Sequence, residues 1–241
     1  MRYTDLKKIV RRHSNKSQAI FLQRFFKTAP GQYAEGDILA GIKVPVQRMI
    51  AKQFNDLSLN ETQKALQSEI HEERLIALFI LVNKFKKTDE KEREKIIRLY
   101  LTNRKHVNNW DLVDLSAPKL LGEWLLDKDR EILFKLASSK NLWDRRISIL
   151  STFKFIQSGE FVTTLRLAKI LLNDKHDLIH KAVGWMLREI GKKDLQSEED
   201  FLEVHYQKMP RTMLRYAIEK FPEPKRKAYL LVKVKSSPLL F

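Results

Sequence analysis

Helix-start signals recur along this chain at an interval of about 34 or 35 residues, and that interval limits the possible folds more than any other feature. Asn109, Asn141, His176 and Pro210 each stand directly before an apolar segment with helical spacing. Such an interval is typical of helical-hairpin repeats, in which each pair of helices buries its apolar face against the neighbouring pairs. The sequence therefore predicts a curved stack of helical hairpins with one concave face.

Signals for other kinds of structure are scarce. The chain has only 7 glycines and 7 prolines, contains no Asn-Gly or Asp-Gly hairpin turn, and shows no alternating strand pattern. The small-residue and proline pattern of tetratricopeptide repeats is also missing, so the repeats resemble HEAT repeats more closely. We predict one all-α, HEAT-like repeat solenoid over residues 1–241. Its helices are expected to begin near Asp5, Ser17, Pro45, Glu61, His71, Glu90, Asn109, Lys128, Leu142, Glu160, Asp177, Ser197 and Arg211.

Basic side chains clearly outnumber acidic ones. The chain has 46 Lys and Arg against 30 Asp and Glu, which gives a formal net charge of +16. A basic surface that neutralises phosphates releases counterions, so its affinity for nucleic acid is sequence-independent and salt-sensitive. We therefore expect the concave face to be basic and to bind nucleic acid. Solubility and attraction to anionic lipid are alternative explanations of the charge taken alone.

Cysteine is absent, which excludes disulfides, thiolate zinc sites, iron–sulfur clusters and a cysteine nucleophile. The first residues lack the apolar core of a signal peptide, and the longest apolar run, Leu75 to Val82, is too short to span a bilayer. We expect a soluble cytoplasmic protein with no membrane partner. P-loop, dinucleotide-binding and Gly-x-Ser-x-Gly motifs are missing, and no cofactor is expected.

The segment from Asp177 to Lys192 places an aromatic residue outside its apolar stripe. On a helical wheel Lys181 and Arg188 fall opposite the stripe, and Trp185 lies beside them. An indole flanked by two cations suits a nucleic-acid surface, since the ring can stack on a base or sugar while the cations bind phosphates. Packing of Trp185 against the next repeat is the alternative interpretation.

A second aromatic residue accompanies a carboxylate in the segment that follows Asn109. Trp110 and Asp114 are four residues apart and so share one helix face, turned away from Leu112 and Leu115. The residues three and four positions from Arg146 are Leu142, Trp143, Ile149 and Leu150, all apolar, so its guanidinium needs an anionic partner. Asp114 and a DNA phosphate are the two partners that we consider.

Three stretches of this chain, Asn108–Asp114, Asn141–Arg146 and Lys181–Glu189, resemble the signature stretches of the AlkD-type DNA alkylation repair glycosylases. The resemblance extends to Gly41–Pro45 and Pro210–Ala217, and so covers most of the chain. Each fragment alone is only modest evidence for the family. Together, in this order and at these separations, they are specific.

The resemblance implies a role for each of four residues. Asp114 would be the catalytic carboxylate, Trp110 and Trp185 the aromatic walls around the damaged nucleotide, and Arg146 the nearby cation. The chain departs from the pattern at Asn109, where some relatives have a second tryptophan. The implied substrate is double-stranded DNA that carries purines alkylated at N3 or N7, whose N-glycosidic bond is hydrolysed in base excision repair.

The resemblance also implies an enzyme that grips the DNA backbone and leaves the lesion largely in the duplex, without base flipping. We expect a monofunctional glycosylase, because no lysine is marked as a nucleophile, and a monomer. The predicted phosphate contacts are Lys43, Arg48, Lys181, Arg188, Arg211 and Arg215.

Three other interpretations are weaker. A non-catalytic HEAT-like module for damaged or branched DNA would share the charge and the fold, and a protein-binding scaffold would share the fold. His176 and His180 are four residues apart and could chelate a metal, but no acidic residue completes the motif. We predict no metal site there and interpret both histidines as surface or capping residues.

Overall fold

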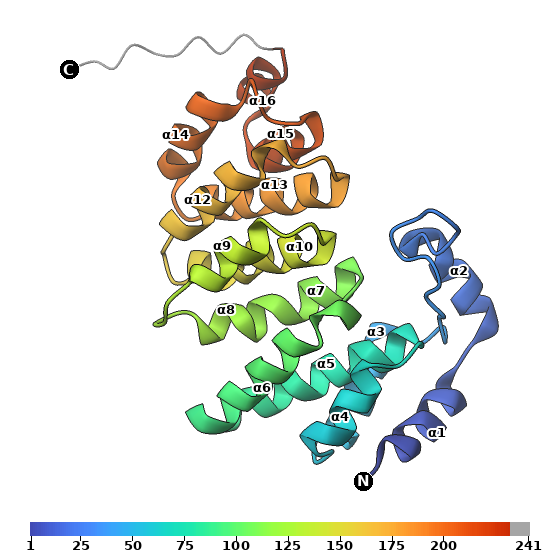
Figure 1. Cartoon of the computed structure of the whole chain (residues 1–241). Coiled ribbons are helices and arrows are strands. Elements are labelled where there is room, and N and C mark those ends of the chain that lie inside the picture. Colours follow the sequence, from blue (N-terminus) through green and yellow to red (C-terminus); the bar gives the residue numbers. More distant parts are fainter. Residues whose placement is uncertain (232–241) are drawn as a thin grey trace. The chain divides into compact units, whose positions relative to one another are not determined.

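A computed structural model describes residues 1–231 of the chain, and these residues form α-helices joined by turns and short 3₁₀ helices (Figure 1). The described part holds no β-strand, only an isolated parallel bridge between Ile38 and Ile70. The predicted all-α helical repeat architecture is confirmed. Within the described residues, none of the helices is long and apolar enough to cross a membrane.

The chain divides into two compact units, residues 1–124 and residues 125–241, of which the second is described up to residue 231. Each unit has its own buried core. The assignment of residues 1–241 to one repeat domain stays a prediction.

The first unit is organised around α5, His71–Phe85. Its residues from His71 to Val82 are all buried, because the helix packs against α3, α4 and α7. The stretch from Leu75 to Val82 is apolar on every side of the helix, whereas the first turn is polar. The bounds of the other elements are α1 Tyr3–His13, α2 Lys16–Phe26, α3 Val44–Gln53, α4 Leu59–Leu66, α6 Glu90–Thr102, α7 Trp110–Ser116 and α8 Leu121–Trp124, with 3₁₀ turns η1 Arg104–His106 and η2 Ala117–Lys119.

The second unit is organised around α13, Asp177–Gly191, which packs against α10, α14 and α15. Gly184 permits the close approach of α15, since a Cβ atom there would lie 2.3 Å from the carbonyl oxygen of Met213. The other elements are α9 Glu131–Ala137, α10 Leu142–Ser151, α11 Phe153–Gln157, α12 Val162–Ile170, η3 Leu171–Asn173, α14 Leu195–His205, α15 Arg211–Ala217, η4 Ile218–Lys220 and α16 Glu223–Leu230.

The start signals of the repeat act as helix caps. The side chains of Asn109, Asn141 and His176 each accept a hydrogen bond from a backbone N–H of the helix that follows, whereas Pro210 precedes α15 without a side-chain cap. All thirteen expected helix starts lie within about three residues of an observed start. The helices α8 and α11 were not predicted, because a single turn carries no periodicity. The start of α16, marked by Pro222 and Pro224, was also missed.

Candidate functional site

Helix α7 presents Trp110 and Asp114 on its accessible side. Asn109 caps the helix by accepting a hydrogen bond from the Trp110 backbone N–H at 2.8 Å. Asp111, Leu112 and Val113 are buried, while Trp110 and Asp114 are both half-buried. The two candidate residues therefore share a partly exposed face, one helical turn apart.

The indole of Trp110 is backed by two further rings. Phe26, the last residue of α2, stacks on Trp110 with ring centroids 5.3 Å apart and an interplanar angle of 12°. The same Phe26 ring lies 4.7 Å from the imidazole of His71. One face of the indole is thus covered by protein, and the orientation of the ring is fixed by packing.

A buried polar network lies behind α7. His71, the first residue of α5, donates from Nε2 to Asp111 Oδ2 at 2.9 Å and from Nδ1 to Asp37 Oδ2 at 3.1 Å. Asp37 also accepts hydrogen bonds from Arg74 Nη2 at 2.6 Å and from Asn109 Nδ2 at 3.2 Å. The network joins the segment before α3, the start of α5 and the start of α7.

The charged forms of His71 and Asp37 are favoured in this network. Burial lowers the pKa of His71, but the negative charge of Asp111 and the hydrogen bonds to Asp111 and Asp37 outweigh it and raise that pKa to about 9. Burial likewise raises the pKa of Asp37, and the hydrogen bond from His71 and the charge of Arg74 bring it below its ordinary value. His71 is therefore an imidazolium at neutral pH, held between two carboxylates.

Arg146 lies on α10 with only 5% of its surface exposed. Its Nη1 donates to the backbone carbonyl of Leu178 in the first turn of α13. The guanidinium therefore ties α10 to the helix that carries Trp185. The sequence correctly indicated that Arg146 lies among apolar neighbours. An anionic partner was expected, and one of the groups that Arg146 contacts is instead the neutral carbonyl oxygen of Leu178.

Trp185 is half-buried on α13 and lies outside the core of the second unit. Its Nε1 donates to Glu189 Oε1 at 3.0 Å, and its ring centroid lies 6.0 Å from that of Phe153. The predicted core stripe of α13 is confirmed: Ile179, Ala182, Val183, Met186, Leu187 and Ile190 are buried, while Leu178 is half-buried.

The two predicted phosphate contacts on α13 have acidic partners within the chain. Lys181 pairs with Asp177 at 2.7 Å. Arg188, whose side chain is mostly buried, pairs with Glu219 and lies 3.6 Å from Glu189 Oε1. Neither cation points into open solvent without a partner.

The other four predicted phosphate contacts, Lys43, Arg48, Arg211 and Arg215, are exposed. Arg211 donates to the carbonyl oxygen of Leu230, and the Arg48 guanidinium lies 4.2 Å from the centre of the Phe79 ring. Near Arg48, burial lowers the pKa of Lys119, and the positive charges of Arg48 and Lys86 lower it further. Lys119, Arg48 and Lys86 therefore repel one another and create a positive potential, which would attract a polyanion.

His176 caps α13, and His180 makes a local contact with the backbone. His176 Nδ1 accepts a hydrogen bond from the Leu178 N–H at 3.1 Å, and His180 Nε2 contacts the carbonyl oxygen of Asp174. This confirms the capping interpretation for His176. Over residues 1–231 no group of three or more His, Cys, Asp and Glu side chains could hold a metal ion.

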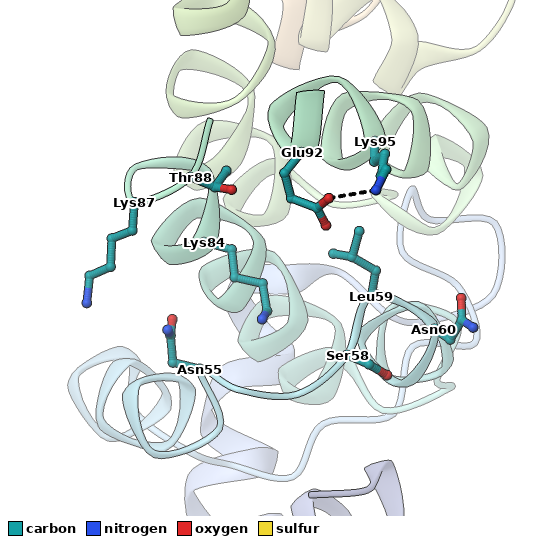
Figure 2. A pocket seen from close by; sticks show the side chains of 9 residues that line it. All are labelled: Asn55, Ser58, Leu59, Asn60, Lys84, Lys87, Thr88, Glu92 and Lys95. Atoms are coloured by element: carbon teal, nitrogen blue, oxygen red, sulfur yellow. Dashed lines mark hydrogen bonds and ion pairs between the residues drawn. The ribbon is translucent and has the colours of Figure 1, made fainter. Parts of the chain in front are cut away.

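A polar cavity of about 530 Å³ lies in the first unit at the far end of α5 from His71 (Figure 2). The close-up shows Lys84, Lys87 and Asn55 at one side of the cavity and the Glu92–Lys95 ion pair at the other. None of the predicted site residues lines it. The cavity is therefore separate from Trp110 and Asp114.

The sequence did not mark three residues as functional: Asp37 and His71 of the buried network, and Lys119 near Arg48. His71 opens the run His71-Glu72-Glu73-Arg74 directly before an apolar segment, and all four of these charged or polar residues are buried. Four such residues directly before the apolar run from Leu75 to Val82 are a signal that could have suggested a buried network. Nothing in the sequence paired them with Asp37 or Asp111.

Trp110 and Asp114 belong to the first unit, and Arg146 and Trp185 belong to the second.

The family model of the DNA alkylation repair enzymes matches residues 6–221. No curated protein matches the chain. The chain is also similar in fold to a solved structure, a predicted DNA alkylation repair enzyme from Enterococcus faecalis, with a TM-score of 0.70 and 17% sequence identity. The match covers 88% of this chain and 98% of that chain. By the match over residues 6–221, this chain belongs to the DNA alkylation repair enzyme family.

Proposed function

We propose that this protein is a DNA glycosylase that hydrolyses the N-glycosidic bond of purines alkylated at N3 or N7 in duplex DNA. One observation carries the proposal: Asp114 and Trp110 lie one turn apart on the partly exposed face of α7, and Trp110 is held in place by the Phe26 ring. Membership of a DNA alkylation repair family supports the choice of substrate.

The main catalytic requirement is to stabilise the positive charge that develops on the sugar. A purine alkylated at N3 or N7 already carries positive charge, so it can leave with the electron pair of the C1′–N bond without strong acid assistance. C1′ then gains oxocarbenium character, which the Asp114 carboxylate stabilises electrostatically. The same carboxylate orients a water molecule, whose oxygen bonds to C1′ while its proton passes to Asp114 and on to solvent.

The aromatic residues recognise the positive charge and the sugar. Indole faces attract cations, so Trp110 and Trp185 would stabilise the charged lesion and contact the deoxyribose. Arg146, tied to the Leu178 carbonyl, is the nearby cation of the family pattern. Hydrolysis of this kind requires no cofactor, and no lysine nucleophile is invoked, so the enzyme would be monofunctional.

DNA binding would rest on phosphate contacts. The exposed cations Lys43, Arg48, Arg211 and Arg215 are the candidates with the least local competition, together with Lys181 and Arg188 on α13. In this proposal a monomer grips the backbone of damaged double-stranded DNA and leaves the lesion in the duplex, which admits bulky adducts.

Base release from a duplex that contains N7-methylguanine tests the proposal. We expect release by the wild type, loss of release in Asp114→Asn, and unchanged release in Asp56→Asn, which removes an exposed carboxylate of the same unit. Binding to the same duplex, followed by fluorescence anisotropy, should be retained in all three proteins.

Tight binding without release by any of the three would contradict the glycosylase proposal and favour a non-catalytic module for damaged DNA. Equal release by the wild type and Asp114→Asn would keep the activity but remove Asp114 from its assigned role.

A further inference from the structure

We propose that His71 is a positioning residue for the proposed glycosylase reaction, on which this inference rests: clamped between Asp37 and Asp111, it fixes the first turn of α7 and thereby the places of Trp110 and Asp114. His71 is not itself expected to touch DNA, since only 1% of its surface is exposed. Its effect would pass through its hydrogen-bond partners and through Phe26.

The hydrogen bonds of the clamp hold both residues that flank Trp110. Asn109 donates to Asp37, and Asp111 accepts from His71. The other carboxylate oxygen of Asp111 accepts the Leu112 backbone N–H at 2.8 Å, so this side chain links the imidazole directly to the first turn of α7. The backbone on either side of the indole is therefore anchored to one carboxylate–imidazole–carboxylate chain.

A second route to Trp110 runs through the aromatic rings. Phe26 lies between His71 and Trp110, at centroid distances of 4.7 Å and 5.3 Å. A shift of the imidazole would therefore move Phe26 and, with it, the indole. Polar contacts and ring packing converge on the same side chain.

The segment that carries Asp37 is itself held in place by α5. Glu72 accepts hydrogen bonds from the backbone N–H groups of Ala40 at 2.7 Å and Gly41 at 2.8 Å. Gly41 has a φ of +79°, and a Cβ atom there would lie 2.1 Å from the Asn15 carbonyl oxygen. These contacts fix the backbone three and four residues after Asp37, and the Asp37 side chain itself is held by His71, Arg74 and Asn109.

The charge of His71 gives the clamp its strength. The charged groups that face the imidazole are the carboxylates of Asp37 and Asp111 and the guanidinium of Arg74. Charge-assisted hydrogen bonds are about twice as strong as neutral ones. Because the pKa of His71 is raised to about 9, the clamp is complete at neutral pH and weakens as the pH rises through that value.

The first experiment compares single-turnover base release and DNA affinity in His71→Gln, Asp111→Asn and the double variant. We expect the rate of release to fall by roughly 10- to 100-fold in each single variant, because a small misplacement of catalytic groups has effects of that size. DNA affinity should change less than about threefold, well below a tenfold change in binding. The double variant should be no slower than the slower single variant, because the two residues act as one unit.

Val82→Ala is the matched control. It truncates a buried side chain of the same helix, about 16 Å along α5 from His71, and so lowers the stability of the first unit without touching the clamp. We expect its rate of release to match the wild type at a temperature below its unfolding transition. A loss of rate in Val82→Ala as large as in His71→Gln would overturn the inference, since general destabilisation would then explain both.

A spectroscopic measurement tests the clamp independently of catalysis. With 5-fluorotryptophan incorporated, the ¹⁹F resonance of Trp110 is assigned by its loss in Trp110→Phe and followed with pH. We expect a shift with a midpoint near pH 9 in the wild type and a midpoint at lower pH in Asp111→Asn, a conservative variant that can still cap Leu112 but has lost the negative charge beside the imidazole.

The outcomes separate the two proposals. A titrating Trp110 resonance without any base release by the wild type would sink the glycosylase proposal and leave the clamp as a structural fact. Base release that is unchanged in both His71→Gln and Asp111→Asn would overturn the positioning role, and so would a Trp110 resonance that does not titrate.

Discussion

Glu198 on α14 offers a quantitative test of how burial acts in the second unit. Its side chain is 2% exposed, packs against Gly191, and has a buried Oε1 atom without a hydrogen-bond partner. It lines a cavity of about 280 Å³ together with Leu195 and Phe221. Burial, and secondarily the negative charge of Glu199, raises the pKa of Glu198 to about 8.

The raised pKa lowers stability as the solution becomes more basic. An unfolded chain ionises Glu198 near pH 4.5, whereas the folded chain keeps the proton up to about pH 8. Between these values the free energy of unfolding falls by about 1.4 kcal/mol per pH unit. Glutamine has nearly the same shape and does not titrate. The free energy of unfolding of Glu198→Gln is therefore expected to be close to that of the wild type at pH 4.5 and about 3 kcal/mol higher than that of the wild type at pH 7.

Urea unfolding at pH 5, 6, 7 and 8 measures this difference. Tryptophan fluorescence follows the second unit, which contains Glu198, through Trp143 and Trp185, and the first unit through Trp110 and Trp124. Glu203→Gln, at an exposed position of the same helix, serves as the control and should show no pH-dependent gain. A Glu198→Gln advantage that does not grow with pH, or a variant less stable than the wild type at pH 8, would refute the reasoning.

Two further predictions concern DNA binding and packing. Arg48→Ala should weaken binding to undamaged duplex and lower the slope of log affinity against log salt by about 1, whereas Arg188→Ala should lower it by less, because Arg188 is already paired with Glu219. Equal slopes in a salt titration would contradict this difference. Gly184→Ala should destabilise the second unit by about 1 to 3 kcal/mol in thermal unfolding, because its Cβ would meet α15. An unchanged melting temperature would show that α15 shifts freely.

Local features of the fold could be predicted from the sequence because they depend on neighbours along the chain. Caps at Asn109, Asn141 and His176 and the buried stripe of α13 follow from spacing alone. The pairing of His71 with Asp37 and Asp111 could not be predicted, since these residues are 34 and 40 positions apart. Only the packed fold brings them within hydrogen-bond distance.

The same limit affects the interpretation of single charges. The sequence placed Arg188 opposite the core stripe of α13 and suggested a phosphate as its partner. The structure gives it Glu219, 31 positions further along, on the neighbouring turn η4. For Trp110 and Asp114 the sequence was sufficient to place both on one face of α7, because a separation of four residues fixes that relation.

The pairing of cations within the chain divides the proposed DNA contacts into two groups. A phosphate that approaches Lys43 or Arg48 finds an exposed charge and gains the full benefit of counterion release. A phosphate that approaches Lys181 or Arg188 must first replace Asp177 or Glu219, so much of its attraction is offset by the lost ion pair. The first group would thus supply affinity for any duplex. The second would contribute only where DNA is held close enough to α13 to compete, the helix on which Trp185 lies.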